Sequence, residues 1–216
     1  MSDDKQLKQN ILAELAWEPS INAAHIGVTT HNGVATISGH VEHYFEKRSA
    51  EAATGRVKGV KAVVEDIEVR VPAYGKRTDE ELATAALNRL DSDISVPRDA
   101  IKLTVEKGWV TLSGAVDWHY QLDAAAQDVR GLVGVIGVSN NITIKQRVNV
   151  SNLSDDIMHA LNRSWFFDPK TINVSATDGR VKLTGTVDSW NEREIAAATA
   201  WAAPGATSVE NDIVVS

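Results

Sequence analysis

The stretch that decides the fold is Gly33-Val34-Ala35-Thr36-Ile37-Ser38-Gly39-His40-Val41, which recurs without a gap at 108–116 and again at 179–187. Each copy places apolar side chains at alternate positions between two glycines. Strict alternation over this length predicts a β-strand with one buried face. Asn32-Gly33 and Asp178-Gly179, which open two of the copies, are strong signals of a tight hairpin turn. The stretch is therefore predicted to be the second strand of a hairpin.

The similarity between the copies extends well beyond this strand. A third glycine follows 20 residues after the second, and an isoleucine lies seven residues before the first. The glycines are Gly59, Gly134 and Gly205, and the isoleucines are Ile26, Ile101 and Ile172. The offsets between copies, 75 and 71 residues, stay constant from about Leu7 to Val69. Chance does not keep so many positions in step, so the chain consists of three copies of one module.

Each copy reads as the same series of elements. Leu7, Ile11 and Leu15 recur at a spacing of four, which predicts an amphipathic helix. Thr78-Asp79-Glu80-Glu81 fits a capping box at the start of the second copy's helix. The hairpin follows, and then an alanine-rich helix over about 45–57, 120–132 and 191–203, which ends at the third glycine as its left-handed cap. A last strand completes an αββαβ order, which predicts an α+β fold with a three-stranded sheet packed against two helices.

The predicted domains are residues 1–71, 77–146 and 149–216. The first junction, 72–77, has the proline, glycine and charged residues of a short linker. The second junction, 147–151, is tighter and more apolar. We therefore expect the second and third modules to be held more closely together than the first and second.

Composition excludes several classes of function. The net charge is −7, and no third of the chain is basic, so no nucleic-acid partner is expected. The chain has no cysteine, which excludes disulfides, thiolate zinc sites and thiol catalysis. No apolar run is long enough for a transmembrane helix. The polar, acidic start, Met1-Ser2-Asp3-Asp4, lacks the apolar core of a secretory signal, and this predicts a cytoplasmic location.

The repeated segments resemble the BON domain (bacterial OsmY and nodulation). The resemblance rests on the Gly-Xaa-Val-Xaa-Leu-Xaa-Gly-Xaa-Val strand, as in 179–187, and on the Gly-Val…Val-Xaa-Asn-Xaa-Ile segment, as in 134–142. It covers almost the whole chain, three times. Two copies depart from the pattern, with Gly205-Ala206 in place of Gly-Val and with Asp66 in place of the asparagine.

The resemblance implies a triple-BON, OsmY-like, transport-associated protein. The family is associated with osmotic and envelope stress and with phospholipid membranes, and it brings no catalytic residue. We therefore expect a non-catalytic stress-response protein that associates with anionic phospholipid, with another envelope component or with itself. Two alternatives are a potassium or small-ligand sensor, and a homo-oligomeric scaffold or channel-forming assembly. Well-known family members are periplasmic, so a periplasmic or peripheral membrane location is the alternative to the cytoplasm.

The aromatic side chains are the first candidate for an interaction surface. No tryptophan position is shared between copies, so a common core does not explain these residues. Packing between modules, self-association, and contact with lipid or ligand remain as explanations. The corner between the second strand and the second helix is also aromatic in every copy. The predicted surface consists of Trp17, Trp109, Trp118, Tyr120, Trp165, Trp190, Trp201, His43 and Tyr44.

Charged side chains supply the second candidate. Arg56, Lys58 and Lys61 border the third strand of the first copy and are predicted to contact phosphate, although the other copies lack this cluster. Four of the six histidines lie in the first copy, where the residues favour a pH-sensitive contact over a metal site. No set of metal ligands, phosphate loop or nucleophile motif is found, so we expect no metal, no cofactor and no enzymatic activity.

Overall fold

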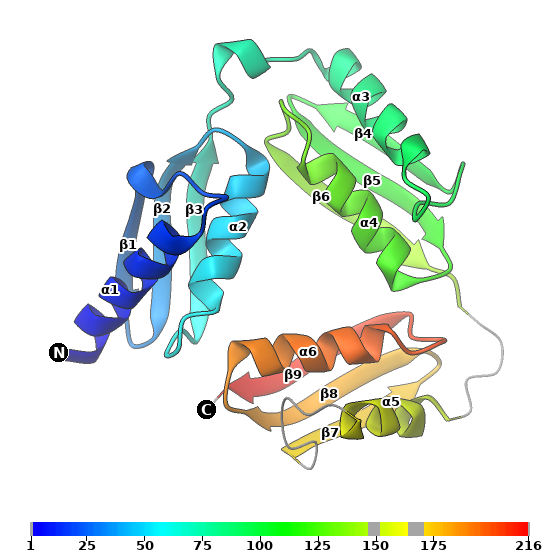
Figure 1. Cartoon of the computed structure of the whole chain (residues 1–216). Coiled ribbons are helices and arrows are strands. Elements are labelled where there is room, and N and C mark those ends of the chain that lie inside the picture. The colour runs from blue at the N-terminus through cyan, green and yellow to red at the C-terminus, as the bar shows by residue number, and fades with distance from the viewer. Residues whose placement is uncertain (1, 147–151, 164–170, 216) are drawn as a thin grey trace. The chain divides into compact units, whose positions relative to one another are not determined.

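The computed structural model describes residues 2–146, 152–163 and 171–215, and within them the chain forms three modules of the same architecture (Figure 1). Module 1 contains α1 (Ser2–Trp17), β1 (Ile26–His31), β2 (Val34–Val41), α2 (Tyr44–Gly55) and β3 (Ala62–Val69). Module 2 contains α3 (Asp79–Ser92), β4 (Ile101–Glu106), β5 (Trp109–Val116), α4 (His119–Arg130) and β6 (Gly137–Ile144). Module 3 contains α5 (Leu153–Asn162), β7 (Ile172–Thr177), β8 (Arg180–Val187), α6 (Trp190–Trp201) and β9 (Ser208–Val215). The predicted α+β class and three-module organisation are confirmed.

The repeated stretch forms the central strand of each sheet. The strand orders are β1-β2-β3, β4-β5-β6 and β7-β8-β9. β1 runs antiparallel to β2, with Ile26 opposite Gly39, whereas β3 runs parallel to β2, with Val34 opposite Ala62. β7, β8 and β9 repeat this arrangement residue for residue. A parallel neighbour needs a crossover connection, which the second helix of the module provides.

Each module buries one face of its sheet under its two helices (Figure 1). Ile37, Leu112 and Leu183, at the same position in the three central strands, are all fully buried. The cores of modules 1 and 3 are each built from residues of that module alone. The other side of each sheet, which we call the open face, carries the alternate residues, such as Val34 and Trp109.

The backbone confirms the predicted turns and one predicted cap. Asn32 and Gly33 both have positive φ values, 51° and 84°, as a two-residue hairpin turn of the primed type requires. The Thr78 amide donates to the Glu81 carboxylate at 2.9 Å, and the Glu81 amide donates to the Thr78 hydroxyl at 3.2 Å. These two reciprocal hydrogen bonds form the expected capping box.

The predicted end of the second helix is wrong. α2 ends at Gly55, four residues before Gly59, so Gly59 is not the helix cap, although its φ of 96° is left-handed. Successive tight turns follow the helix, in which Val57 N–H donates to Thr54 and Val60 N–H donates to Val57. These turns carry Val60 into the core, where it is 3% exposed. The apolar second junction, 147–151, lies outside the described residues.

Candidate functional site

Each module has a helix corner, which we define as the end of its first helix together with the start of its second. In module 1 the buried Glu46 fixes this corner. Its carboxylate accepts hydrogen bonds from the Asn22 amide at 3.2 Å and from the His43 amide at 2.9 Å. Asn22 lies in the loop after α1 and His43 precedes α2, so one carboxylate joins the two helix ends.

The helix corner of module 1 exposes aromatic side chains. Trp17, the last residue of α1, is 84% exposed, and Phe45 is 39% exposed with the His43 ring stacked 5.8 Å away. Tyr44 is half-buried. Tyr74 is 79% exposed, and its hydroxyl lies 3.2 Å from the Glu42 carboxylate. Desolvation, followed by this hydrogen bond, raises the pKa of Tyr74. Phe45 and Tyr74 are therefore additions to the predicted surface.

The corners of the other modules carry different residues, and that of module 2 repeats the exposure. In module 2 Ile94 is fully exposed and Tyr120 is 58% exposed, whereas Trp118 is half-buried. In module 3 Trp190 is half-buried, with the Arg193 guanidinium 4.9 Å from its ring centre. Trp165 lies outside the described residues. A solvent-facing apolar group therefore recurs at the corners of modules 1 and 2, while its position in the alignment changes.

Two predicted tryptophans lie elsewhere. Trp109 projects from the open face of module 2, and its indole Nε1–H donates to the Ser139 hydroxyl at 2.9 Å. Trp201 is half-buried at the last residue of α6, the opposite end of that helix from Trp190. Within their own modules, Trp109 and Trp201 therefore lie apart from the helix corner.

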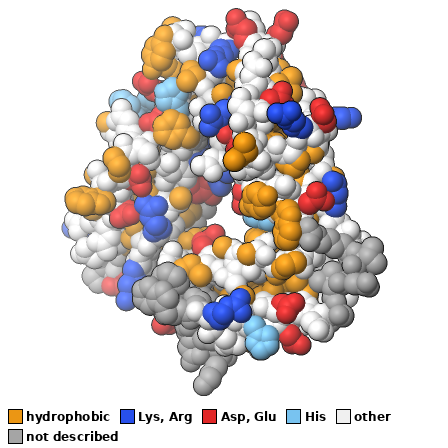
Figure 2. Space-filling view, turned by 45° about the vertical axis from the view of Figure 1, so that its right-hand side comes forward, with side chains coloured by type: hydrophobic (Ala, Val, Ile, Leu, Met, Phe, Trp, Pro, Cys, Tyr) orange, Lys and Arg blue, Asp and Glu red, His pale blue; other side chains and the backbone are white. Residues whose placement is uncertain are grey.

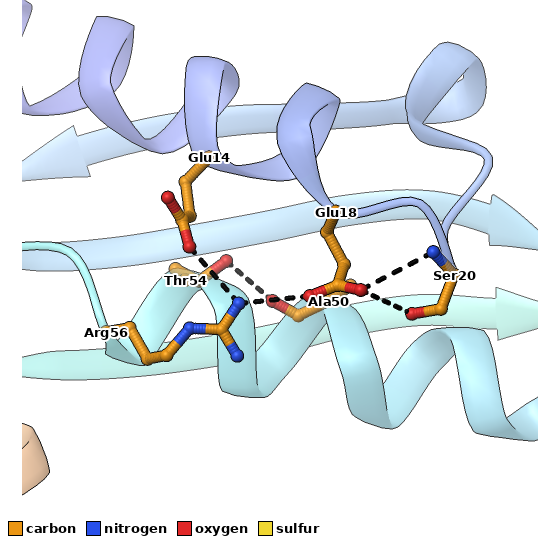
Figure 3. Close-up of polar contacts among 6 residues, drawn as sticks. All are labelled: Glu14, Glu18, Ser20, Ala50, Thr54 and Arg56. Atoms are coloured by element: carbon orange, nitrogen blue, oxygen red, sulfur yellow. Dashed lines mark hydrogen bonds and ion pairs between the residues drawn. The ribbon is translucent and has the colours of Figure 1, made fainter.

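The predicted basic cluster is divided in the same way. Arg56 lies between the two helices of module 1, where one guanidinium nitrogen is 3.1 Å from Glu14 and 3.1 Å from Glu18 (Figure 3). Desolvation lowers the pKa of Arg56, but its hydrogen bonds to Glu18 and Glu14 outweigh this effect, so the pKa is raised overall. Two carboxylates therefore neutralise the side chain that was predicted to contact phosphate.

The two lysines of the cluster face another part of module 1. Lys58 and Lys61 line a hollow of about 560 Å³ together with Asp3 and Asp4, at the start of α1. Trp17 is at the other end of the same helix. The hollow contains both signs of charge, so the lysines do not form a purely cationic site.

The ion pairs of Arg56 lead to a prediction about acid stability. A hydrogen bond from Ser20, followed by one from Arg56, lowers the pKa of Glu18 from its ordinary value of 4.5. A lowered folded-state pKa means that ionised Glu18 stabilises the native state above the unfolded pKa, and that this contribution is lost as the pH falls through the folded value. We expect Glu18→Gln to lower the melting temperature near pH 7, and we expect this difference from the wild type to disappear as the pH falls through the lowered folded-state pKa of Glu18. Glu106→Gln, at an exposed position, is the control. A pH-independent loss in Glu18→Gln would contradict this assignment.

The structure also brings together two histidines that sequence reasoning left apart. The rings of His25 and His40 are stacked with centroids 4.6 Å apart. His25 ends the short 3₁₀-helix η1 (Ala23–His25), and His40 lies near the end of β2. Among the described residues, no group of three histidine or carboxylate side chains is arranged to hold a metal ion.

The described surface mixes residue types. In the face shown in Figure 2, hydrophobic side chains lie interspersed with acidic and basic ones. None of the described helices combines the length and the apolar character needed to cross a membrane.

Comparisons with known proteins agree with the repeat. The chain is 30% identical over 147 residues to the Osmotically-inducible protein Y of Escherichia coli (strain K12), which covers 66% of this chain and 73% of that protein. Two solved structures of CdsD, a structural protein of the Type III secretion system of Chlamydia trachomatis, align at 17% and 18% identity, each with a TM-score of 0.28. The first alignment covers 98% of this chain and 92% of the solved chain, and the second covers 97% of each. The BON domain model matches residues 3–71, 78–146 and 149–216, and the chain therefore belongs to the BON-domain family as a triple-BON, OsmY-like protein.

Proposed function

We propose that this chain is a non-catalytic, osmotic-stress-related protein that binds phospholipid surfaces through its helix corners. The relation to osmotic stress is supported by its similarity to an osmotically inducible protein over two-thirds of its length. The observation that carries the mode of binding is the exposure of Trp17 and Tyr120 at equivalent ends of two modules.

The chemistry of these side chains fits a membrane interface. Tryptophan and tyrosine have an apolar ring and one polar group, and both are enriched where hydrocarbon meets the headgroups. Fully burying an apolar side chain of this size contributes roughly 1.5–3 kcal/mol. A few such anchors give a weak, reversible association, as expected of a peripheral protein.

The charges of module 1 indicate that apolar contact dominates this binding. Arg56 is neutralised by Glu14 and Glu18, and Lys58 and Lys61 lie beside Asp3 and Asp4. These lysines are at the opposite end of α1 from Trp17. Binding through the helix corners therefore needs little attraction between cations and lipid phosphate, and salt should screen it only weakly.

Co-sedimentation with vesicles tests this proposal. We expect the full-length chain to pellet with phosphatidylcholine vesicles and with vesicles that also contain phosphatidylglycerol, at both low and high salt. Trp17→Ala combined with Tyr120→Ala should remove most of the pelleted fraction, because both anchors are lost. Lys58→Ala combined with Lys61→Ala is the matched control and should pellet like the wild type.

Three outcomes would overturn the proposal. The first is a failure of the wild type to pellet with either vesicle. The second is a loss of binding in the lysine variant alone, which would indicate an electrostatic site. The third is a concentration-dependent rise in mass by light scattering that Trp17→Ala with Tyr120→Ala abolishes, which would assign the corners to self-association.

A further inference from the structure

On the open face of module 2 the second and third strands carry no charged side chain, unlike the corresponding strand pairs of the other modules. On the open face of module 1, β3 carries Asp66 and Glu68. On that of module 3, Lys182 of β8 lies 3.0 Å from Glu210 and 2.7 Å from Asp212 of β9. In module 2, β5 and β6 contain no charged residue at all. Their open-face side chains are those of Trp109, Thr111, Ser113, Ala115, Ser139, Asn141 and Thr143.

The ring of Trp109 lies flat on this face because Gly137 makes room for it. A Cβ atom at Gly137 would lie 2.3 Å from Cε3 and 2.4 Å from Cζ3 of the indole. The other modules have Val34 with Ala62 and Arg180 with Ser208 at the two equivalent positions, which are paired across the strands. The module with the tryptophan is thus the one with the glycine. The packing of Trp109 over Gly137 is therefore specific to module 2, and the fold shared by the three modules does not require it.

The indole is held in place as well as exposed. Its Nε1–H donates to Ser139 at 2.9 Å, and one ring face rests on the Gly137 backbone. The residue remains 47% exposed. A rigid aromatic face that is fixed before binding loses little conformational entropy when a ligand covers it.

The composition of the face identifies the chemistry of a ligand. A charged ligand would find no opposite charge on β5 or β6. Charged side chains border them at Lys102 and Glu106 of β4 and at Asp117 and Lys145, which form an ion pair of 3.5 Å just beyond the ends of β5 and β6. A purely apolar ligand would remove water from the Thr111 hydroxyl and the Asn141 amide without replacing its hydrogen bonds, which costs free energy. Sugar rings satisfy both requirements, because they combine an apolar C–H face with several hydroxyl groups and carry no charge when neutral.

We propose that the open face of module 2 binds neutral glycan chains. Trp109 provides the stacking platform. The hydroxyl groups of Thr111 and Ser139 and the side-chain amide of Asn141 can each donate and accept hydrogen bonds. This site is separate from the helix corners and does not depend on their binding to lipid.

Titration followed by nuclear magnetic resonance tests the site in the full-length chain. The six indole N–H signals are followed while chitotetraose or cellotetraose is added, and Trp109→Phe identifies the signal of Trp109. We expect the Trp109 signal to shift on titration and the others to stay. Trp109→Ala should weaken binding about tenfold or more, because the ligand loses both the apolar area that it buries on the indole and the stacking contact itself. Trp17→Ala, which removes an exposed tryptophan outside this face, should bind like the wild type.

A second variant keeps the test independent of folding. Asn141 is exposed, so Asn141→Ala should weaken glycan binding severalfold without changing the melting temperature. The proposal is overturned if neither oligosaccharide shifts the Trp109 signal, or if Trp109→Ala and Asn141→Ala bind as tightly as the wild type. It is also overturned if the Trp109 signal shifts with protein concentration instead, since this would show that a second copy covers the face.

Discussion

Gly39→Ala is expected to unfold module 1, with a loss of about 4 kcal/mol or more in the free energy of unfolding. Gly39 has a φ of +133°, a conformation that side-chain-bearing residues rarely adopt. A Cβ atom there would lie 1.9 Å from the carbonyl oxygen of His25, which belongs to the backbone. Because Gly39 is paired with Ile26 in the hairpin, relief would require the two strands to separate.

Hydrogen exchange read out by mass spectrometry can assign the loss to a module. We expect Gly39→Ala to remove the protection of β1, β2 and β3 while β7 to β9 keep theirs, because the core of module 3 contains only its own residues. Gly27→Ala, on the neighbouring strand, is the control, since its added Cβ would meet nothing closer than 3.6 Å. Unchanged protection of β2 in Gly39→Ala would show that the closed hairpin accommodates a Cβ atom at this position, and would contradict the prediction.

The same steric reason explains why this glycine recurs. At Gly114 and Gly185 the added Cβ would lie 2.1 Å and 2.0 Å from the backbone oxygens of Ala100 and Thr171. The sequence pattern therefore predicts the fold on two grounds. The glycine marks a position where the backbone leaves no room for a side chain, and the alternating apolar residues mark the face of the strand that enters the core. Both kinds of information are local, and both are repeated three times.

The candidate sites depend on contacts between residues that are far apart in the sequence, and local sequence patterns do not indicate such contacts. Arg56 meets Glu18 and Glu14 across 38 and 42 residues, so its charge looks free in the sequence and is neutralised in the structure. The helix corners are assembled from positions that do not align between copies, such as Trp17 and Tyr120. Comparison of the aligned copies showed only that these side chains do not belong to a common core.

The sequence does contain one indication of the contact between Trp109 and Gly137 on the open face of module 2. Gly137 aligns with Ala62 and Ser208, so this glycine is not part of the repeated pattern. It lies opposite Trp109, which is equally specific to the second copy. A pair of changes at positions that face each other across parallel strands indicates a contact. The parallel register is needed to recognise it, and sequence alternation alone does not specify which strands are neighbours.

Leu112→Ala is expected to destabilise module 2 by about 2–5 kcal/mol. Leu112 is fully buried in the central strand beneath α3 and α4, and it occupies the position of Ile37 and Leu183 in the other modules. Removing its side chain loses the apolar transfer energy and leaves a cavity. A module of roughly 70 residues is near the lower limit for an independent core, so this loss is a large share of its stability.

Thr111→Ala is the matched control for this prediction, because Thr111 is the adjacent residue on the same strand and faces the opposite side of the sheet. We expect it to change the free energy of unfolding by less than about 1 kcal/mol, as is usual for substitutions outside the core. Urea denaturation and module-resolved hydrogen exchange should show Leu112→Ala lowering the protection of β4 to β6 while β2 and β8 remain protected. Equal effects of Leu112→Ala and Thr111→Ala would mean that the helix-covered face of β5 is not the core of module 2. A loss of protection spread evenly over β2, β5 and β8 would mean instead that the three modules unfold as one cooperative unit, although the described cores of modules 1 and 3 draw on no residue of another module.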